Sequence, residues 1–317
     1  MFHFIGDLLS PPRAHRRLSI VIYHRVLRAP DSILEDETHA AAFEMHVRLL
    51  AGEFNVLRLS EACARLEAGD LPTRAVCITF DDGYADNHEV ALPILKRHGV
   101  VATFFVSPGY SEGGSMFNDI VIEALRAAPA GAHDLSGLGL GHLQLGDSAS
   151  RRAGIDALIR QIKYRAPAER MALAAGIAAA VRSAVPRNLM MTPAQIRRMH
   201  DEGMEIGAHT VTHPILASIG EDEARAEIVD SRGRLEEIVG APVTLFAYPN
   251  GTPGRDYRPE HVRLVKEAGY SAAVAAVGGI AHGASDPFQL PRFGLYDRTP
   301  FKLGARLLAG YVRPLPA

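Results

Sequence analysis

Short apolar runs alternate along the chain with longer segments in which apolar residues recur every three or four positions. The short runs predict buried strands at residues 18–23, 76–80, 101–107, 204–208, 243–248, 271–276 and 290–295, with a shorter extended piece at 54–59. The longer segments predict helices at residues 43–53, 60–69, 87–98, 118–128, 155–164, 168–185, 192–202, 221–239, 257–268 and 301–308. Repeated strand–helix units indicate a parallel sheet. About seven such strands favour a (β/α) barrel over an open sheet, although the pattern alone leaves both open.

Residues 109–191 interrupt this alternation. Glycines are frequent in the first half of the segment, its helical stretches follow one another without strands between them, and residues 135–145 alternate like a small hairpin. It has few aromatic or β-branched residues from which to build a core of its own. We therefore expect a single domain over residues 1–317 with a mainly helical insertion at about 109–191, which is a candidate lid or substrate-facing wall.

Two adjacent carboxylates end the most apolar strand. Asp81 and Asp82 follow the run 76–80, and Gly83 ends it, because glycine enters left-handed backbone conformations without steric cost. An Asp-Gly pair can simply mark a hairpin turn, but here a helical pattern follows instead of a return strand. Two neighbouring anions repel each other unless a proton or a cation intervenes. A divalent metal would relieve this repulsion, with one carboxylate as ligand and the other free to act as a base.

Two histidines, His209 and His213, lie four residues apart on a turn after the strand at 204–208. Alone they could be surface or capping histidines. With Asp82 they would form an Asp-His-His set that leaves positions open for water and substrate, as catalytic zinc sites do, although cobalt, nickel and iron also accept such ligands. The carboxyl ends of barrel strands meet at one face. We therefore expect one site to be formed by the polar residues at strand ends, which are His24, Asp81, Asp82, His209, His213, Tyr248, Asn250 and Arg292.

Composition narrows the classes of function. The 317 residues are 47% hydrophobic and 22% charged, which is ordinary for a globular protein, and the formal net charge of −2 argues against a dedicated nucleic-acid binder. We expect no transmembrane segment, since no apolar run approaches the roughly 18 residues required, and no signal peptide, so cytoplasmic residence is the expectation. Cys63 and Cys77 are expected to be small core residues. The sequence does not indicate the oligomeric state.

Two motifs together resemble those of a known family. TFDDGY at residues 79–84 and HTVTHP at residues 209–214 are similar to motifs of the polysaccharide deacetylase family, also called carbohydrate esterase family 4, which has the NodB-like fold. The resemblance covers the stretches around 76–107 and 203–275. It implies a distorted (β/α) barrel of about seven parallel strands and the metal-dependent removal of N- or O-acetyl groups from sugars.

The same resemblance implies roles for the residues of the two motifs. Asp81 would be the general base, and Asp82, His209 and His213 would hold the metal, most often Zn²⁺. The metal and a backbone N–H near Tyr84 or Tyr248 would stabilise the oxyanion that forms on the acetyl group.

The chain departs from the family pattern at two points. Ala247 stands where the family's third motif typically carries an arginine, and the late Leu-x-His that supplies the general acid is missing. Residues 23–26, Tyr-His-Arg-Val, resemble instead the branch of poly-N-acetylglucosamine deacetylases and their exopolysaccharide-associated relatives, in which an N-terminal strand brings the acid histidine. That branch implies His24 as the general acid and Arg292 as the group that orients Asp81. The plain alternatives are a core histidine and a surface ion pair.

We therefore expect a carbohydrate deacetylase whose substrate is an acetylated polysaccharide or oligosaccharide, with N-acetyl the favoured group and exopolysaccharide biosynthesis the favoured setting. Tyr84, Tyr248 and Asn250 are expected to contact the sugar. A metal-dependent amidohydrolase for a small amide and a non-catalytic carbohydrate-binding relative are the alternatives. The histidines in helices and loops without a partner pattern are expected to be solvated, and they are His46, His88, His98, His142, His200, His261 and His282.

Overall fold

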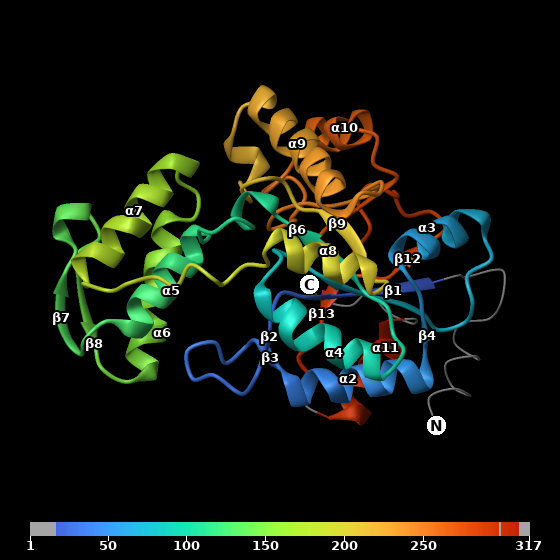
Figure 1. Cartoon of the computed structure of the whole chain (residues 1–317), viewed down its shortest axis with the longest axis horizontal. Coiled ribbons are helices and arrows are strands. Elements are labelled where there is room, and N and C mark those ends of the chain that lie inside the picture. The colour runs from blue at the N-terminus through green and yellow to red at the C-terminus, as the bar shows by residue number, and fades with distance from the viewer. Residues whose placement is uncertain (1–16, 298, 311–317) are drawn as a thin grey trace.

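The computed structural model describes residues 17–297 and 299–310 (Figure 1). Within these residues the main sheet has nine strands, which are β1 (Arg17–Tyr23), β4 (Asn55–Val56), β5 (Ala75–Phe80), β6 (Thr103–Val106), β9 (Glu205–Ala208), β10 (Leu245–Ala247), β11 (Ala272–Val274), β12 (Ala281–His282) and β13 (Phe293–Gly294). Their order is β11-β10-β9-β6-β5-β1-β12, with β4 beside β5 and β13 beside β1. The pairings are parallel except that of β12 with β1.

The sheet is curled, and one late segment bridges its open side. Leu290 forms a parallel bridge with Val274 of β11, and β13 then pairs with Val21 and Ile22 of β1. The result is a distorted (β/α) barrel, which confirms the predicted fold class. β11 and β13 are shorter than the apolar runs that predicted them, because an apolar run reports burial and continues beyond the last paired residue.

Helices surround the sheet (Figure 1). One of the predicted helices is divided: residues Asn87–Ala91 form a π-helical turn in which the Leu92 N–H donates to the Asn87 carbonyl five residues back. Pro93 explains this widening, since it has no N–H to continue the α-helical pattern. The helices outside the insertion are α2 (Ala40–Glu53), α3 (Leu59–Ala68), α4 (Leu92–Arg97), α8 (Pro193–Asp201), α9 (Glu221–Val239), α10 (Pro259–Glu267) and α11 (Pro300–Gly310), and a two-stranded ladder of β2 (Val26–Leu27) and β3 (Thr38–His39) lies beyond β1.

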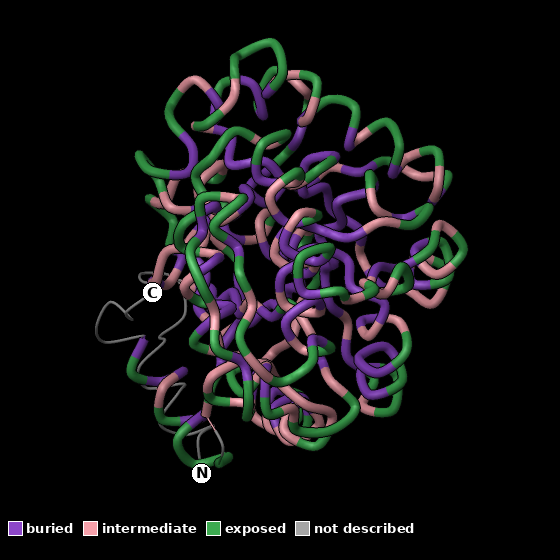
Figure 2. Tube along the Cα trace, turned by 90° about the vertical axis from the view of Figure 1, so that its left-hand side faces the viewer, coloured by how far each residue is buried: buried purple, intermediate pink, exposed green. Residues whose placement is uncertain are grey.

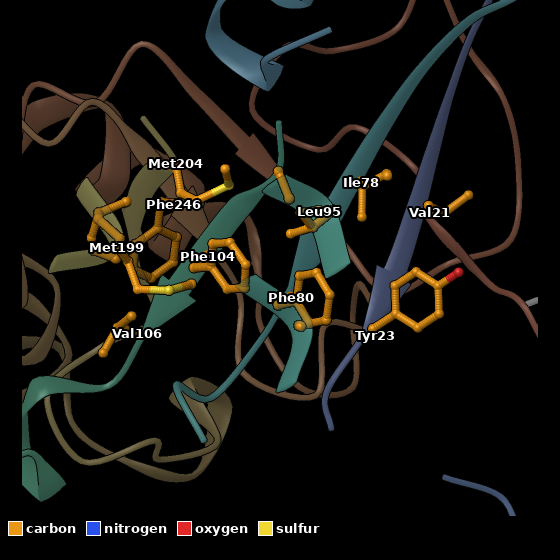
Figure 3. Close-up of a cluster of buried hydrophobic side chains, with 14 of the residues drawn as sticks. Val21, Tyr23, Ile78, Phe80, Leu95, Phe104, Val106, Met199, Met204 and Phe246 are labelled. Atoms are coloured by element: carbon orange, nitrogen blue, oxygen red, sulfur yellow. The ribbon is translucent and has the colours of Figure 1, made fainter. Parts of the chain in front are cut away.

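The core lies on both faces of the strands, as the buried stretches inside the molecule show (Figure 2). On the outer face, Tyr23, Phe80 and Phe104 form a row across β1, β5 and β6 (Figure 3), with ring centres 5.3 and 4.6 Å apart. Such pairs contribute about 0.5–1.5 kcal/mol each beyond their buried area. On the inner face, Cys77 is fully buried, whereas Cys63 of α3 is partly buried, and both are free thiols that pack with the apolar interior.

The insertion forms a lobe beside the barrel (Figure 1). Its elements are α5 (Phe117–Ala127), the antiparallel pair β7 (Gly131–Asp134) and β8 (His142–Leu145), α6 (Ser148–Ile162) and α7 (Pro167–Ala180). A hairpin is therefore present, but its first strand lies before the predicted stretch 135–145, and residues 135–141 form the connection between the strands. The expectation that the insertion has no core of its own is wrong, because leucine, isoleucine and alanine side chains at helical spacing pack into a separate cluster that includes Val121, Leu125, Leu158, Ile162 and Ile177.

Candidate active site and metal centre

Loops at the carboxyl ends of the strands enclose a cavity of about 420 Å³. The polar residues at the strand ends therefore line one common cavity. Arg292 is buried and bonded to Asp81, and the other predicted site residues line the cavity, namely His24, Asp81, Asp82, Tyr84, His209, His213, Tyr248 and Asn250.

Left-handed backbone conformations at non-glycine residues are concentrated in these loops. The φ angles are 75° at Asp82, 60° at Thr210, 55° at His213 and 59° at Asn250, and Gly83 follows Asp82 with a φ of 89°. Such conformations cost of the order of 1–3 kcal/mol each and persist only where surrounding contacts hold them. Here they belong to the turns that bring two of the predicted metal ligands, Asp82 and His213, to one cavity.

Asp82, His209 and His213 converge. The Nε2 atoms of His209 and His213 lie 3.5 and 3.3 Å from Oδ1 of Asp82, and one ligand atom from each residue lies within 4.8 Å of the others. The Nδ1–H of His209 donates to the Ala247 carbonyl at 2.7 Å, which leaves the Nε2 lone pair directed to the cavity. Oδ1 of Asp82 is buried and has no hydrogen-bond partner among the described residues. Because an unsatisfied buried carboxylate oxygen is costly, the three residues fit a divalent cation.

Burial and charge set the protonation of these three residues. Burial lowers the pKa of His213 to about 3, so this imidazole is neutral and able to coordinate. Burial alone would raise the pKa of Asp82, but the attraction of His213 and His209 outweighs it and holds the pKa well below its usual range. At His209 burial acts to lower the pKa, and the neighbouring carboxylates Asp81 and Asp82 raise it on balance.

Asp81 is held by a guanidinium. Arg292 donates to both of its carboxylate oxygens at 2.7 Å, in a bidentate pair that is buried on both sides. The same guanidinium donates to the Ala275 carbonyl and to Oγ1 of Thr79, and it lies 5.4 Å from the centre of the Phe105 ring. Burial by itself would raise the pKa of Asp81, but the charge of Arg292 outweighs it and lowers the pKa. Asp81 is thus an ionised, oriented carboxylate, which is what a general base requires.

His24 lies at the exposed side of the cavity, where its carbonyl accepts a hydrogen bond from Nδ2 of Asn87 at 2.9 Å. Glu37, which the sequence analysis missed, lines the same cavity; burial raises its pKa against the attraction of His24. Glu37 belongs to an irregular acidic stretch that carries no strand-end signal. Asn250 is half-buried on the cavity wall, where the prediction of a sugar contact places it.

Tyr84 and Tyr248, which were both predicted to contact the sugar, differ in their backbone N–H groups and in the position of their rings. The Tyr84 N–H has no acceptor among the described residues, whereas the Tyr248 N–H donates to the Val274 carbonyl at 3.2 Å. The Tyr248 ring stacks on Tyr257 with centres 3.8 Å apart, and its hydroxyl donates to the Phe288 carbonyl. Only Tyr84 therefore has a backbone donor available for a substrate oxygen, and the Tyr248 ring belongs to the core.

Two residues of the insertion, which no motif marked, tie it to the loops of the site. The Tyr84 hydroxyl donates to Oδ1 of Asp119 in α5 at 2.9 Å, and burial raises the pKa of Asp119 to about 7. Arg170 of α7 donates to the His213 carbonyl at 3.1 Å, and its guanidinium lies 4.6 Å from the centre of the Phe117 ring. Both Asp119 and Arg170 are buried. The insertion thus contacts both loops that carry predicted metal ligands.

The expectation that the remaining histidines are solvated is wrong for two of them. His46 is buried; its Nε2–H donates to the Asp297 carbonyl, and its Nδ1 accepts from the Tyr23 hydroxyl. His261 is also buried, and its Nδ1 accepts from the Arg258 N–H at the start of α10. Both histidines satisfy polar groups of the barrel, so their role is structural.

Comparisons with known proteins give one family. A family model described as polysaccharide deacetylase matches residues 68–161 and 171–273, more than half of the chain. A protein of Bacillus subtilis (strain 168), YxkH, whose name assigns it provisionally to the polysaccharide deacetylases, is 22% identical over 283 residues, which are 87% of this chain and 70% of the relative.

Solved structures share the fold. The Streptococcus pyogenes deacetylase PplD, in complex with acetate, is 20% identical with a TM-score of 0.63, over 92% of this chain and 97% of that chain. IcaB from Ammonifex degensii is 17% identical with a TM-score of 0.60, over the same shares of the two chains.

Proposed function

The chain belongs to the polysaccharide deacetylase family, hydrolases of amide and ester bonds on carbohydrates, and from that premise we propose that it uses a divalent metal, zinc foremost, to remove N-acetyl groups from a polysaccharide or oligosaccharide. We propose exopolysaccharide biosynthesis as the setting, since IcaB is among the proteins that share the fold. The observation that carries the proposal is the convergence of Asp82, His209 and His213 beside Asp81, the carboxylate that Arg292 keeps ionised.

Asp82, His209 and His213 would hold the metal. A divalent cation at such a site lowers the pKa of water and polarises a carbonyl group. The ligand set supports zinc because it combines one carboxylate oxygen with two imidazole nitrogens, and it also suits cobalt, nickel or iron.

The chain's own groups would carry the proton transfers. Asp81 takes a proton from the attacking water while the water oxygen bonds to the acetyl carbon. The Tyr84 N–H donates to the acetyl oxygen as negative charge develops on it. His24 gives a proton to the sugar nitrogen as the C–N bond breaks, so that acetate and a free amine leave. Arg292 acts through Asp81, which it orients and keeps ionised.

The test is acetate release from N-acetylglucosamine oligomers by protein purified without added metal and then loaded with Zn²⁺. We expect activity that a chelator abolishes and Zn²⁺ restores, and that falls by about 10²–10⁴ in Asp81→Asn, the range for loss of a general base. Asp222→Asn, which changes an exposed carboxylate at the start of α9, is the matched control and should retain full activity. Full activity in Asp81→Asn would contradict the assigned base.

The same preparation separates the alternative functions. Turnover of small linear or cyclic amides without acetate release from sugars would favour the amidohydrolase. Sugar binding without acetate release would favour a non-catalytic relative. This alternative is tested because Ala247 stands where the family's third motif typically carries an arginine. Arg292 speaks against this alternative, because it brings a buried guanidinium to Asp81 from the segment that precedes β13.

The cellular location stays a prediction. No helix of the described residues has both the length and the apolar character needed to cross a bilayer. Cytoplasmic residence is our proposal, and fractionation of cells followed by detection of the protein tests it.

A further inference from the structure

One wall of the candidate active-site cavity comes from the insertion. Phe117 and Ile122 of α5 and Ile159 of α6 give this wall an apolar surface, and Asn118 and Lys163 add polar groups to it. Because the wall faces the same space as Asp82 and the two histidines, whatever binds at the metal site also meets the insertion.

Lys163 is the one lysine or arginine among the described residues that line this cavity. It is half-buried, and no carboxylate of a described residue lies within ion-pair distance of its ammonium group. The ammonium lies 5.7 Å from the centre of the Tyr164 ring. Burial lowers the pKa of Lys163, and the more distant charge of Asp256 acts in the opposite direction. The residue is therefore a cation partly removed from water without a direct counter-ion.

Among the described residues, no carboxylate that lines the cavity lies within ion-pair distance of Lys163. Asp81 is paired with Arg292, and Asp82 faces the two histidine nitrogens that would share a cation with it. Burial raises the pKa of Glu37 and outweighs the attraction of His24 and Arg25. The ammonium group of Lys163 is thus able to pair with a negatively charged group of a ligand that enters the cavity.

One arginine links the backbone of Lys163 to the backbone of a predicted metal ligand. Arg170 donates to the Lys163 carbonyl at 3.4 Å through one nitrogen and to the His213 carbonyl at 3.1 Å through another. This buried guanidinium fixes the base of the lysine side chain relative to a predicted metal ligand. A group bound by the ammonium would accordingly lie in the same cavity as the proposed metal site.

We propose that Lys163 binds an anionic substituent of the substrate, a carboxylate or a phosphate, so that the preferred substrate is an acidic acetylated glycan. The apolar side chains of the wall pack against the sugar ring that carries or neighbours the anion. The proposal rests on the proposed deacetylase function and adds the class of glycan.

The test compares three acetylated oligosaccharides of equal length: a neutral one, one with a uronic acid next to the N-acetyl sugar, and one with a phosphodiester in that place. We expect the wild-type KM to be about tenfold lower for at least one anionic substrate, equivalent to about 1.4 kcal/mol. Lys163→Gln should remove this difference, so that the KM values of the anionic substrates rise to that of the neutral one measured with the same variant. Lys163→Arg should keep most of it. Lys302→Gln, at an exposed lysine of α11, is the matched control and should behave like the wild type.

Salt provides an independent readout. Raising NaCl from about 0.1 to 1 M shortens the Debye length from about 10 to 3 Å, so the wild-type preference for the anionic substrate should shrink while Lys163→Gln stays insensitive. The two anionic substrates show whether the carboxylate or the phosphate is the better ligand. Equal KM values for all three substrates, or a preference that survives in Lys163→Gln, would overturn the proposal.

Failure of the proposed function has a different signature. In that case no substrate releases acetate, and the oligosaccharides are titrated into the metal-loaded protein by calorimetry. Tighter binding of an anionic oligosaccharide that Lys163→Gln abolishes still supports the subsite, and binding without such a difference refutes it.

Discussion

Replacing Arg292 by methionine should destabilise the protein strongly. The change removes two 2.7 Å bonds to Asp81 and leaves that carboxylate buried, 3% exposed, without its counter-ion. Removing one partner of a buried ion pair costs about 3–5 kcal/mol. We expect the free energy of unfolding of Arg292→Met at pH 7 to fall by about that amount.

The pH dependence should also change sign. In the wild type the folded-state pKa of Asp81 is lowered, so its contribution to stability is present above the unfolded pKa, about 3.9, and is lost as the pH falls through the folded value. Without the guanidinium, burial is left to raise the pKa of Asp81. Its contribution in Arg292→Met should then be favourable below the unfolded pKa and be lost as the pH rises through the raised folded pKa.

Urea denaturation from about pH 2.5 to pH 8 measures both effects through the midpoint and slope. The double variant Asp81→Asn/Arg292→Met removes both charges and should be more stable at pH 7 than Arg292→Met alone. Arg263→Met, which breaks exposed ion pairs to Glu221 and Glu267, is the control and should leave the free energy of unfolding nearly unchanged, because water screens exposed pairs. An Arg292→Met protein as stable as the wild type, with the same pH slope, would refute the reasoning.

Three further predictions concern the site. Arg170→Met removes the donor to the His213 carbonyl and should weaken Zn²⁺ affinity about 10–100-fold, as loss of such supporting contacts does; competition with a chromophoric chelator measures this, and unchanged affinity would contradict it. His24→Gln should lower kcat by about 10²–10⁴ with unaltered Zn²⁺ affinity, and a normal kcat would remove His24 as the acid. Gly83→Ala would place a Cβ 2.8 Å from Cγ1 of Val106 at a φ of 89° and should lower the unfolding free energy by more than about 1 kcal/mol; an unshifted denaturation midpoint would show that the turn tolerates a side chain.

The barrel and the centre of the site could be predicted because their signals are local. Burial on both faces makes β5 a continuous apolar run, and Asp81 and Asp82 are sequence neighbours at its end. His209 and His213 likewise follow one strand. The direction of a side chain is not local: Tyr248 lies at the cavity as predicted, yet its ring turns into the core because Tyr257 is there to stack on it.

The contribution of the insertion could not be predicted for the same reason. Asp119, Lys163 and Arg170 occupy helical segments in which a polar residue usually faces water. Only the docking of these helices beside the barrel makes Asp119 and Arg170 buried hydrogen-bond partners and Lys163 part of the cavity. Periodicity specifies which face of a helix is apolar, but not the neighbour that it meets.

The bridging of the curled sheet by residues around 290 has a consequence for biosynthesis. During translation the carboxylate pair and both imidazoles leave the ribosome before Arg292, which directly precedes β13 and bonds Asp81. A nascent protein can thus assemble its cation-binding loops while the future base still lacks its guanidinium, and the base acquires its working ionisation only when the barrel is completed. Catalysis would then be withheld from unfinished chains, and turnover by a fragment that stops short of Arg292 would show otherwise.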